Sequence, residues 1–207
     1  MTEPSNDWFR DYRPQTCLLT AEDYDNLDEE VCRRIEVIDG FIISCEAPSR
    51  DHQRAVRRLA DLVEKHARAA MAHGHPCLEV DFDVDLRLRD VPLFNLRPDV
   101  VLYRCLDRGR NERLKAEHAL LVIEVVSPSS ETRDTTDKVG EYAKAGIPNY
   151  WIVWLDTTGI STIERYRLER VSRTYKHIGT FMKDEAGEPP LITNPIPITI
   201  DWDQLEF

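Results

Sequence analysis

The chain has 207 residues, of which 42% are hydrophobic, enough for one domain with a real core. It contains no run of eighteen apolar residues and begins with a polar segment, so we expect neither a membrane span nor a secretory signal. The net charge of −11 argues against a broad basic surface, although a local basic patch is still compatible with it.

Cysteine usage points to a reducing environment. The five cysteines are scattered, odd in number and contain no CxxC pair (positions 17, 32, 45, 77 and 105). A disulfide framework or a thiolate zinc site is therefore not expected, and we predict reduced thiols in a cytoplasmic protein.

The sequence predicts a polar N-terminal tail over residues 1–17, followed by one domain over residues 18–207. Residues 20–30 are expected to form a helix capped by Thr20, with Asp23 at the capping-box position. Residues 33–46 alternate as a β-hairpin that turns at Asp39-Gly40.

Residues 50–71 give the clearest helical pattern. Asp51 is the expected N-cap, and apolar residues recur at positions i, i+3, i+4 and i+7. The opposite face is basic, with five Lys/Arg against three Asp/Glu over 51–68. This is the local candidate for phosphate contacts, the alternative being an ordinary solvated face. Residues 78–88 then alternate apolar and charged, which predicts one strand with a buried and an exposed face.

The remaining elements predict the centre of a sheet. Two nearly continuous apolar runs, 98–103 and 119–126, are typical of strands covered on both faces. A helix over 135–145 with Asp134 as N-cap follows, then a strand over 149–155 and a hairpin within 160–182. The core order of helix, three strands, helix and strand predicts an α/β fold, a mixed sheet flanked by helices with an added hairpin at each end.

Two acidic residues stand in unusual places. Asp99 opens one apolar run, and Glu124 lies inside the other. A buried carboxylate without a partner costs several kcal/mol, so each needs a metal, a cation or a hydrogen-bond network.

A symmetric antiparallel pairing of the two runs would bring these acids together. If paired residue numbers sum to 223, Asp99 faces Glu124, and opposed side chains lie roughly 4.5–5.5 Å apart at Cβ. Two carboxylates this close repel unless a cation lies between them, and their oxygens suit Mg²⁺ or Mn²⁺. The sequence therefore predicts a metal site at Asp99 and Glu124.

Lys138 is the third candidate. It shares a helical face with Tyr142 and Ala145. If this helix packs over the sheet, the ammonium can reach the carboxylate pair and orient an attacking water or stabilise a transition state.

Several segments taken together resemble a known family. RPDVVLY at 97–103 and LVIEVVSPSSETRDTTDKVGEYAKAGIPNYWIV at 121–153 resemble the Uma-type restriction endonuclease family, a branch of the PD-(D/E)XK nuclease-like superfamily. So do IEVIDGFI, APSRDHQRAVRRL and PIPITIDWDQL, and the resemblance covers roughly residues 18–207.

The resemblance implies a restriction-endonuclease-like core and metal-dependent phosphodiester cleavage. Asp99 matches the PD aspartate and Glu124 the following acid, while Glu36 and His52 match recurrent positions near the metal or substrate. The usual lysine two residues after the acid is Val126 here, and Lys138 resembles the relocated lysine of this branch.

Each candidate also has a purely structural interpretation. Asp99 can be a solvated strand start, and Glu124 can pair with Arg97. Lys138 can pair with Glu141 on the helix surface, and Glu36 with Arg33 or Arg34. His52 can be a surface or capping residue.

The function that we expect is an endonuclease that hydrolyses phosphodiester bonds, most simply in DNA, with Mg²⁺ or Mn²⁺ at Asp99 and Glu124. Cutting both strands favours a homodimer. A catalytically inactive binding or regulatory protein is the alternative, favoured by Val126 and the acidic charge. A metal-dependent hydrolase of a small phosphoester is a third interpretation.

Overall fold

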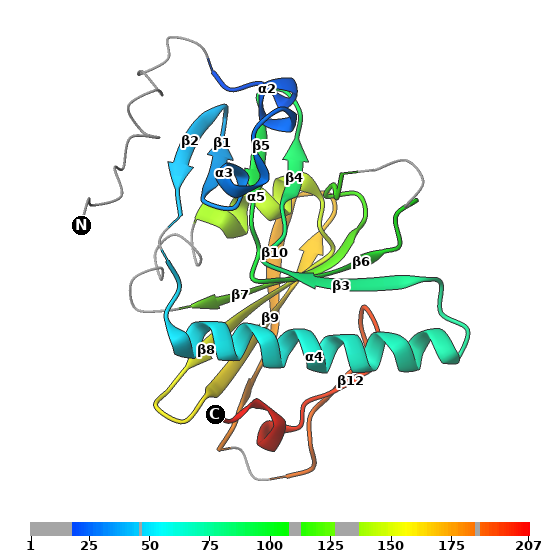
Figure 1. Cartoon of the computed structure of the whole chain (residues 1–207). Coiled ribbons are helices and arrows are strands. Elements are labelled where there is room, and N and C mark those ends of the chain that lie inside the picture. Colours follow the sequence, from blue (N-terminus) through cyan, green and yellow to red (C-terminus); the bar gives the residue numbers. More distant parts are fainter. Residues whose placement is uncertain (1–17, 46, 108–112, 127–136, 185–186) are drawn as a thin grey trace, which may run out of the picture.

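The computed structural model describes residues 18–45, 47–107, 113–126, 137–184 and 187–207. Its centre is a six-stranded sheet in the order β10-β9-β8-β7-β6-β3 (Figure 1). The strands are β3 (Leu78–Phe82), β6 (Val100–Arg104), β7 (Ala119–Val126), β8 (Asn149–Leu155), β9 (Ile160–Glu169) and β10 (Thr174–Met182). Only the β7–β8 pair is parallel among these neighbours, so the predicted mixed α/β fold is confirmed.

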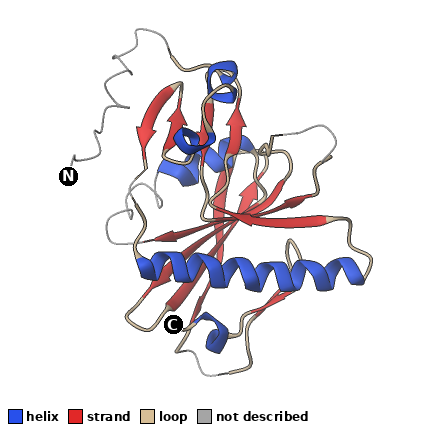
Figure 2. Cartoon of the chain, in the orientation of Figure 1, coloured by secondary structure: helices blue, strands red, loops and turns tan. Residues whose placement is uncertain are grey.

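The two long helices cover opposite faces of this sheet (Figure 2). Helix α4 (Arg50–Ala72) packs Leu59 and Val63 against Leu121 and against the strand residues whose side chains point to the same face of the sheet as Leu121. Helix α5 (Lys138–Ala145) covers the other face of the sheet, where Tyr142 packs in the same buried cluster as Val122. Every residue of β7 is buried, which explains why its sequence is apolar except at Glu124.

A smaller sheet lies beside the main one, in the order β2-β1-β5-β4 (Figure 1, upper part). Its strands are β1 (Ile35–Ile38), β2 (Phe41–Ser44), β4 (Leu86–Arg89) and β5 (Phe94–Leu96). Asp39 and Gly40 form the β1–β2 turn with positive φ angles of 52° and 82°. A Cβ on Gly40 would lie 2.6 Å from the Cβ of Leu18, so the turn requires glycine both for its backbone and for space.

Two helix predictions need correction. The segment 20–30 forms two short helices, α2 (Ala21–Asp25) and α3 (Glu29–Cys32), although the Thr20–Asp23 capping box is present. Asn26 is the C-cap of the first helix, and both its backbone amide and its side-chain amide donate to the Glu22 carbonyl. Helix α4 is capped by Ser49, which accepts from the amide of His52, so the predicted cap at Asp51 was wrong.

The single strand predicted over 78–88 is also wrong, because β3 and β4 belong to different sheets. Asp83 adopts a positive φ of 51° between them and turns the chain from one sheet to the other. Arg87, which alternation placed on the exposed face, is 5% exposed and pairs with Asp25 at 2.6 Å. The alternating pattern continues through the break, so it carried no sign of the change of sheet.

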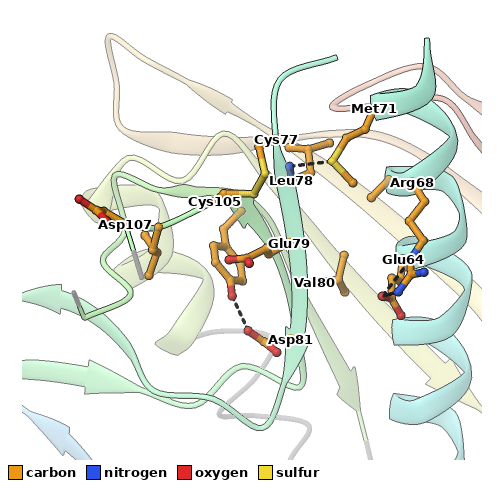
Figure 3. A pocket seen from close by; sticks show the side chains of 13 residues that line it. Glu64, Arg68, Met71, Cys77, Leu78, Glu79, Val80, Asp81, Cys105 and Asp107 are labelled. Atoms are coloured by element: carbon orange, nitrogen blue, oxygen red, sulfur yellow. Dashed lines mark hydrogen bonds and ion pairs between the residues drawn. A yellow bond between two sulfur atoms is a disulfide. The ribbon is translucent and has the colours of Figure 1, made fainter. Parts of the chain in front are cut away.

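Cys77 and Cys105 form a disulfide, which contradicts the prediction of reduced thiols. The pairing of Leu78 with Arg104 places these cysteines opposite each other at the edge of the sheet (Figure 3). Their Cα atoms are 5.4 Å apart. The pair is invisible in the sequence because the two residues are separated by 28 positions and meet only through the β3–β6 register.

The C-terminal part of the chain covers the α4 side of the core. It contains β11 (Leu191–Ile192), β12 (Ile198–Thr199) and the 3₁₀ helix η3 (Trp202–Leu205), and Ile198 and Leu205 are buried in the α4 cluster. Among the described helices, none is both long and apolar enough to cross a membrane.

Candidate active site

The β6–β7 register brings the two predicted acids together. Val100 pairs with Ile123 and Leu102 with Leu121, so the paired numbers sum to 223 as expected, up to a bulge before Tyr103. Asp99 immediately precedes β6, and its Oδ2 accepts a hydrogen bond from the amide of Val125 at 2.6 Å. The aspartate is therefore fixed beside Glu124 by the backbone of the neighbouring strand.

Lys138 lies between two buried glutamates. Its Nζ is 3.2 Å from Oε1 of Glu124 and 3.3 Å from Oε1 of Glu36. The lysine is 8% exposed, and the two glutamates are 1% and 2% exposed. Helix α5 thus packs over the sheet as predicted and directs an ammonium group into the carboxylates. The alternative surface pair with Glu141 is wrong, because Glu141 pairs with Lys144.

Glu36 reaches the site from the smaller sheet. Strand β1 places it in the interior, where its Oε1 also accepts a hydrogen bond from the amide of Arg97 at 3.1 Å. The alternative pairs with Arg33 and Arg34 do not form, since these arginines pair with glutamates of α3, as i, i+4 neighbours. The site therefore draws carboxylates from both sheets.

His52 contacts Asp99 from the first turn of α4. Its Nε2 is 2.9 Å from Oδ1 of Asp99, and the two side chains are 16% and 19% exposed. Asp99 is therefore neither deeply buried nor a solvated strand start. The backbone amide of His52 is held by Ser49, so the helix cap also fixes the position of the imidazole.

Tyr142 was noted in the sequence only for sharing a face with Lys138. Its hydroxyl donates to Oε1 of Glu124 at 2.7 Å, and its side chain is completely buried. Burial, and then the charge and hydrogen bond of Glu124, raise the pKa of Tyr142 well above its ordinary value. The phenol therefore stays a neutral donor, and the i, i+4 spacing from Lys138 was the signal that could have assigned it to the site.

The arrangement leaves an excess of negative charge. Glu36, Asp99 and Glu124 carry three negative charges against one positive charge on Lys138, which gives −2 when His52 is neutral. The guanidinium of Arg97, suggested as a partner for Glu124, instead pairs with Asp85 and Asp83.

The donor set suits a hard divalent cation. Mg²⁺ is commonly held by one or two carboxylates together with water, and Asp99 and Glu124 offer such a pair. No group of three or more His, Cys, Asp or Glu side chains in the described part of the chain is arranged around one point as a metal site. An ion at this centre would therefore depend on two protein carboxylates. The predicted cap Asp134 lies outside the described residues.

A separate cavity of about 730 Å³ is lined by residues of α4, of β3 and of the end of β6 with the chain that follows it (Figure 3). The disulfide, Met71, Tyr103 and several acidic side chains line it, and none of the five candidate residues does. The candidate site is thus recognised by its convergent charged groups and not by the size of a pocket.

Comparisons with known proteins agree with this fold. The structure is similar to a crystal structure of "a putative nuclease belonging to DUF820" from Anabaena variabilis, with a TM-score of 0.59 and 17% sequence identity. The match covers 86% of this chain and 89% of that chain. No curated protein sequence matches the chain. The family model Uma2, described as "Putative restriction endonuclease", matches residues 21–200, and the chain therefore belongs to the Uma2 family.

Proposed function

We propose that the chain is a metal-dependent endonuclease that hydrolyses phosphodiester bonds in DNA. The observation that carries the proposal is the convergence of Asp99, Glu124 and Lys138, with Glu36 and His52 beside them. Membership of a family of restriction endonucleases, and a nuclease as structural neighbour, support the same class of reaction.

Asp99 and Glu124 would hold Mg²⁺ or Mn²⁺. Such an ion lowers the pKa of a bound water and neutralises charge on a phosphoryl oxygen. The ammonium of Lys138 supplies positive charge and three hydrogen-bond donors in a buried setting, where it would orient water or stabilise the charge that develops on the phosphate.

Glu36 and Tyr142 would act as positioning residues. Glu36 contacts the lysine ammonium, and Tyr142 fixes one oxygen of Glu124. His52 would hold or exchange a proton next to Asp99, since its imidazole contacts that carboxylate directly. We further propose that the protein acts as a homodimer, because cleavage of both strands requires two such centres.

The test is nicking of supercoiled plasmid with Mg²⁺ and separately with Mn²⁺. Wild type is compared with Asp99→Asn, Glu124→Gln and Lys138→Met, with Lys144→Met as the control from the same helix. Nicking by wild type and the control that the three site variants lose is the expected result. Equal nicking by all five proteins would indicate a contaminant and overturn the assignment.

A non-catalytic binding or regulatory protein is the second candidate. Val126 at the position of the usual superfamily lysine and the net charge of −11 favour it. Absence of nicking with either metal, together with retained binding of duplex DNA, would select this function. Hydrolysis of a small phosphoester that duplex DNA does not inhibit would instead select a metal-dependent hydrolase of small phosphoesters, the third candidate function.

A further inference from the structure

The β9–β10 hairpin carries a net positive charge in this acidic chain. Residues 160–183 contain six Lys/Arg and two Asp/Glu, a net charge of +4, while the whole chain carries −11. The polar face of α4, which the sequence suggested for phosphate contacts, reaches only +2. The hairpin is therefore the more basic segment, and counting charge per predicted element would have found it.

Three of these cations lie on one face of the hairpin. Arg165 and Arg167 are two residues apart on β9, and Lys176 of β10 pairs directly with Arg167. Arg165 also pairs with Trp151 of β8, which faces the α4 side of the sheet. Because side chains alternate along a strand, Arg165, Arg167 and Lys176 all project to that side. We call these three residues the hairpin cations.

The side chain of Arg165, the first hairpin cation, is held in place by its neighbours. The guanidinium carbon of Arg165 lies 4.1 Å from the centroid of the Phe181 ring, a stacking distance that restrains the side chain. A β-bulge between His177 and Gly179 places Gly179 opposite it. A Cβ on Gly179 would lie 2.9 Å from a terminal nitrogen of Arg165, so the glycine leaves the space that the guanidinium fills.

The hairpin cations lack counter-ions among the described residues. None of the ion pairs within that part of the chain includes Arg165, Arg167 or Lys176, whereas Arg54 and Arg68 of α4 pair with acids one turn away. Burial, and then the charge of Arg167, lower the pKa of Arg165. Glu169 lies on the same face of β9 but forms no ion pair with the hairpin cations in the described part of the chain. Like charges that no ion pair neutralises cost free energy in the isolated protein, and an anionic partner would recover it.

We propose that Arg165, Arg167 and Lys176 form a contact surface for the phosphate backbone of duplex DNA, set apart from the Asp99–Glu124 centre. This inference rests on the proposed function for the choice of DNA as the polyanion. Glu124 belongs to the α5 face of the sheet and the hairpin cations to the α4 face. The surface therefore anchors nucleic acid without contributing to the chemistry.

The test compares two charge-matched variants of the full chain. Arg167→Gln with Lys176→Gln removes two exposed hairpin cations, and Arg57→Gln with Lys65→Gln removes two exposed cations of α4. Binding to a fluorescein-labelled DNA duplex is followed by anisotropy in EDTA, over a series of salt concentrations. Each lost phosphate contact lowers the slope of log affinity against log salt by about 0.9.

The expected result is weaker binding and a slope smaller by about 2 for the hairpin variant, with the α4 variant equal to wild type. Equal losses of affinity in both variants would show a response to net charge alone and would overturn the proposed contact surface. Loss of affinity in the α4 variant alone, or no DNA binding by wild type, would overturn it as well. Plasmid nicking in parallel separates the two proposals. If the wild type nicks plasmid and the hairpin variant binds DNA as well as wild type, only the proposed contact surface is overturned. If the hairpin variant alone loses binding but the wild type never nicks plasmid, only the proposed nuclease activity is overturned.

Discussion

Tyr142 and Lys138 contact the same carboxylate oxygen, Oε1 of Glu124, at 2.7 Å and 3.2 Å. Both donors come from one face of α5, so a single helix sets the orientation of the carboxylate on β7. These two contacts fix the Glu124 carboxylate in the protein interior. A carboxylate that moved freely could not hold a metal ion in one place.

Tyr142→Phe should reduce metal-dependent nicking by about tenfold, because the group that orients a ligand is lost while the aromatic ring remains. It should also lower the free energy of unfolding by about 1.5–3 kcal/mol, the range for a hydrogen bond to a charged group. Both are measured on the same preparation, by plasmid nicking and urea unfolding.

Tyr175→Phe is the matched control for this substitution. Its hydroxyl donates to the carbonyl of Ile147 at 2.8 Å on the same side of the sheet, and this hydrogen bond involves no candidate residue. It should lose stability and keep its nicking rate. A similar fall in nicking for both variants would show that the Tyr142 effect comes from packing alone.

Lys138→Met should destabilise the metal-free protein by about 3–5 kcal/mol, since it removes a cation from among buried carboxylates. Mn²⁺ should raise the melting temperature of this variant more than that of wild type, because the site then carries −3. Lys144→Met, at a side chain 67% exposed, should change stability by less than about 0.5 kcal/mol. An equal Mn²⁺ shift in wild type and Lys138→Met would contradict a metal at this centre.

The cross-strand disulfide should contribute about 2–4 kcal/mol, because it closes a loop of 28 residues between β3 and β6. Unfolding of wild type with and without dithiothreitol measures this contribution. The Cys77→Ser, Cys105→Ser double variant should match the reduced protein and be insensitive to the reductant. Full reactivity of all five thiols in denatured, unreduced protein would show that the bond does not form.

Alkaline pH should destabilise the smaller sheet through Tyr24. Its buried hydroxyl donates to Asp85 at 2.8 Å, and burial, followed by the charge of Asp85, raises its pKa far above the ordinary value of 10.0. A raised pKa in the folded state gives stability that is complete below about pH 10 and is lost as pH rises further.

Tyr24→Phe should therefore be less stable than wild type at pH 7, by about 1–3 kcal/mol, and show a shallower loss between pH 10 and 12. Melting temperatures across that range provide the measurement. Parallel curves for the two proteins would show that Tyr24 does not control the alkaline transition.

The sequence was informative where local pattern and chemistry agree. The two apolar runs and the symmetry of their connection predicted the register that places Asp99 against β7, and the helical spacing of Lys138 predicted its approach to Glu124. The break at Asp83, the Cys77–Cys105 bond and the burial of Glu36 were missed or left open. Each depends on how one sheet meets another or on a distant strand pairing, and alternation along a single strand does not report such contacts.

The division of the site between two sheets makes the proposed activity depend on the smaller sheet as well as on the main one. Glu36 is carried by β1 of the smaller sheet, while Glu124 belongs to the main sheet and Asp99 immediately precedes its strand β6. A sub-global opening that detaches β1 would withdraw Glu36 from Lys138 and leave the main core intact. Thermal inactivation should therefore precede global unfolding, and amide hydrogen exchange in β1 should follow the loss of activity more closely than exchange in β7.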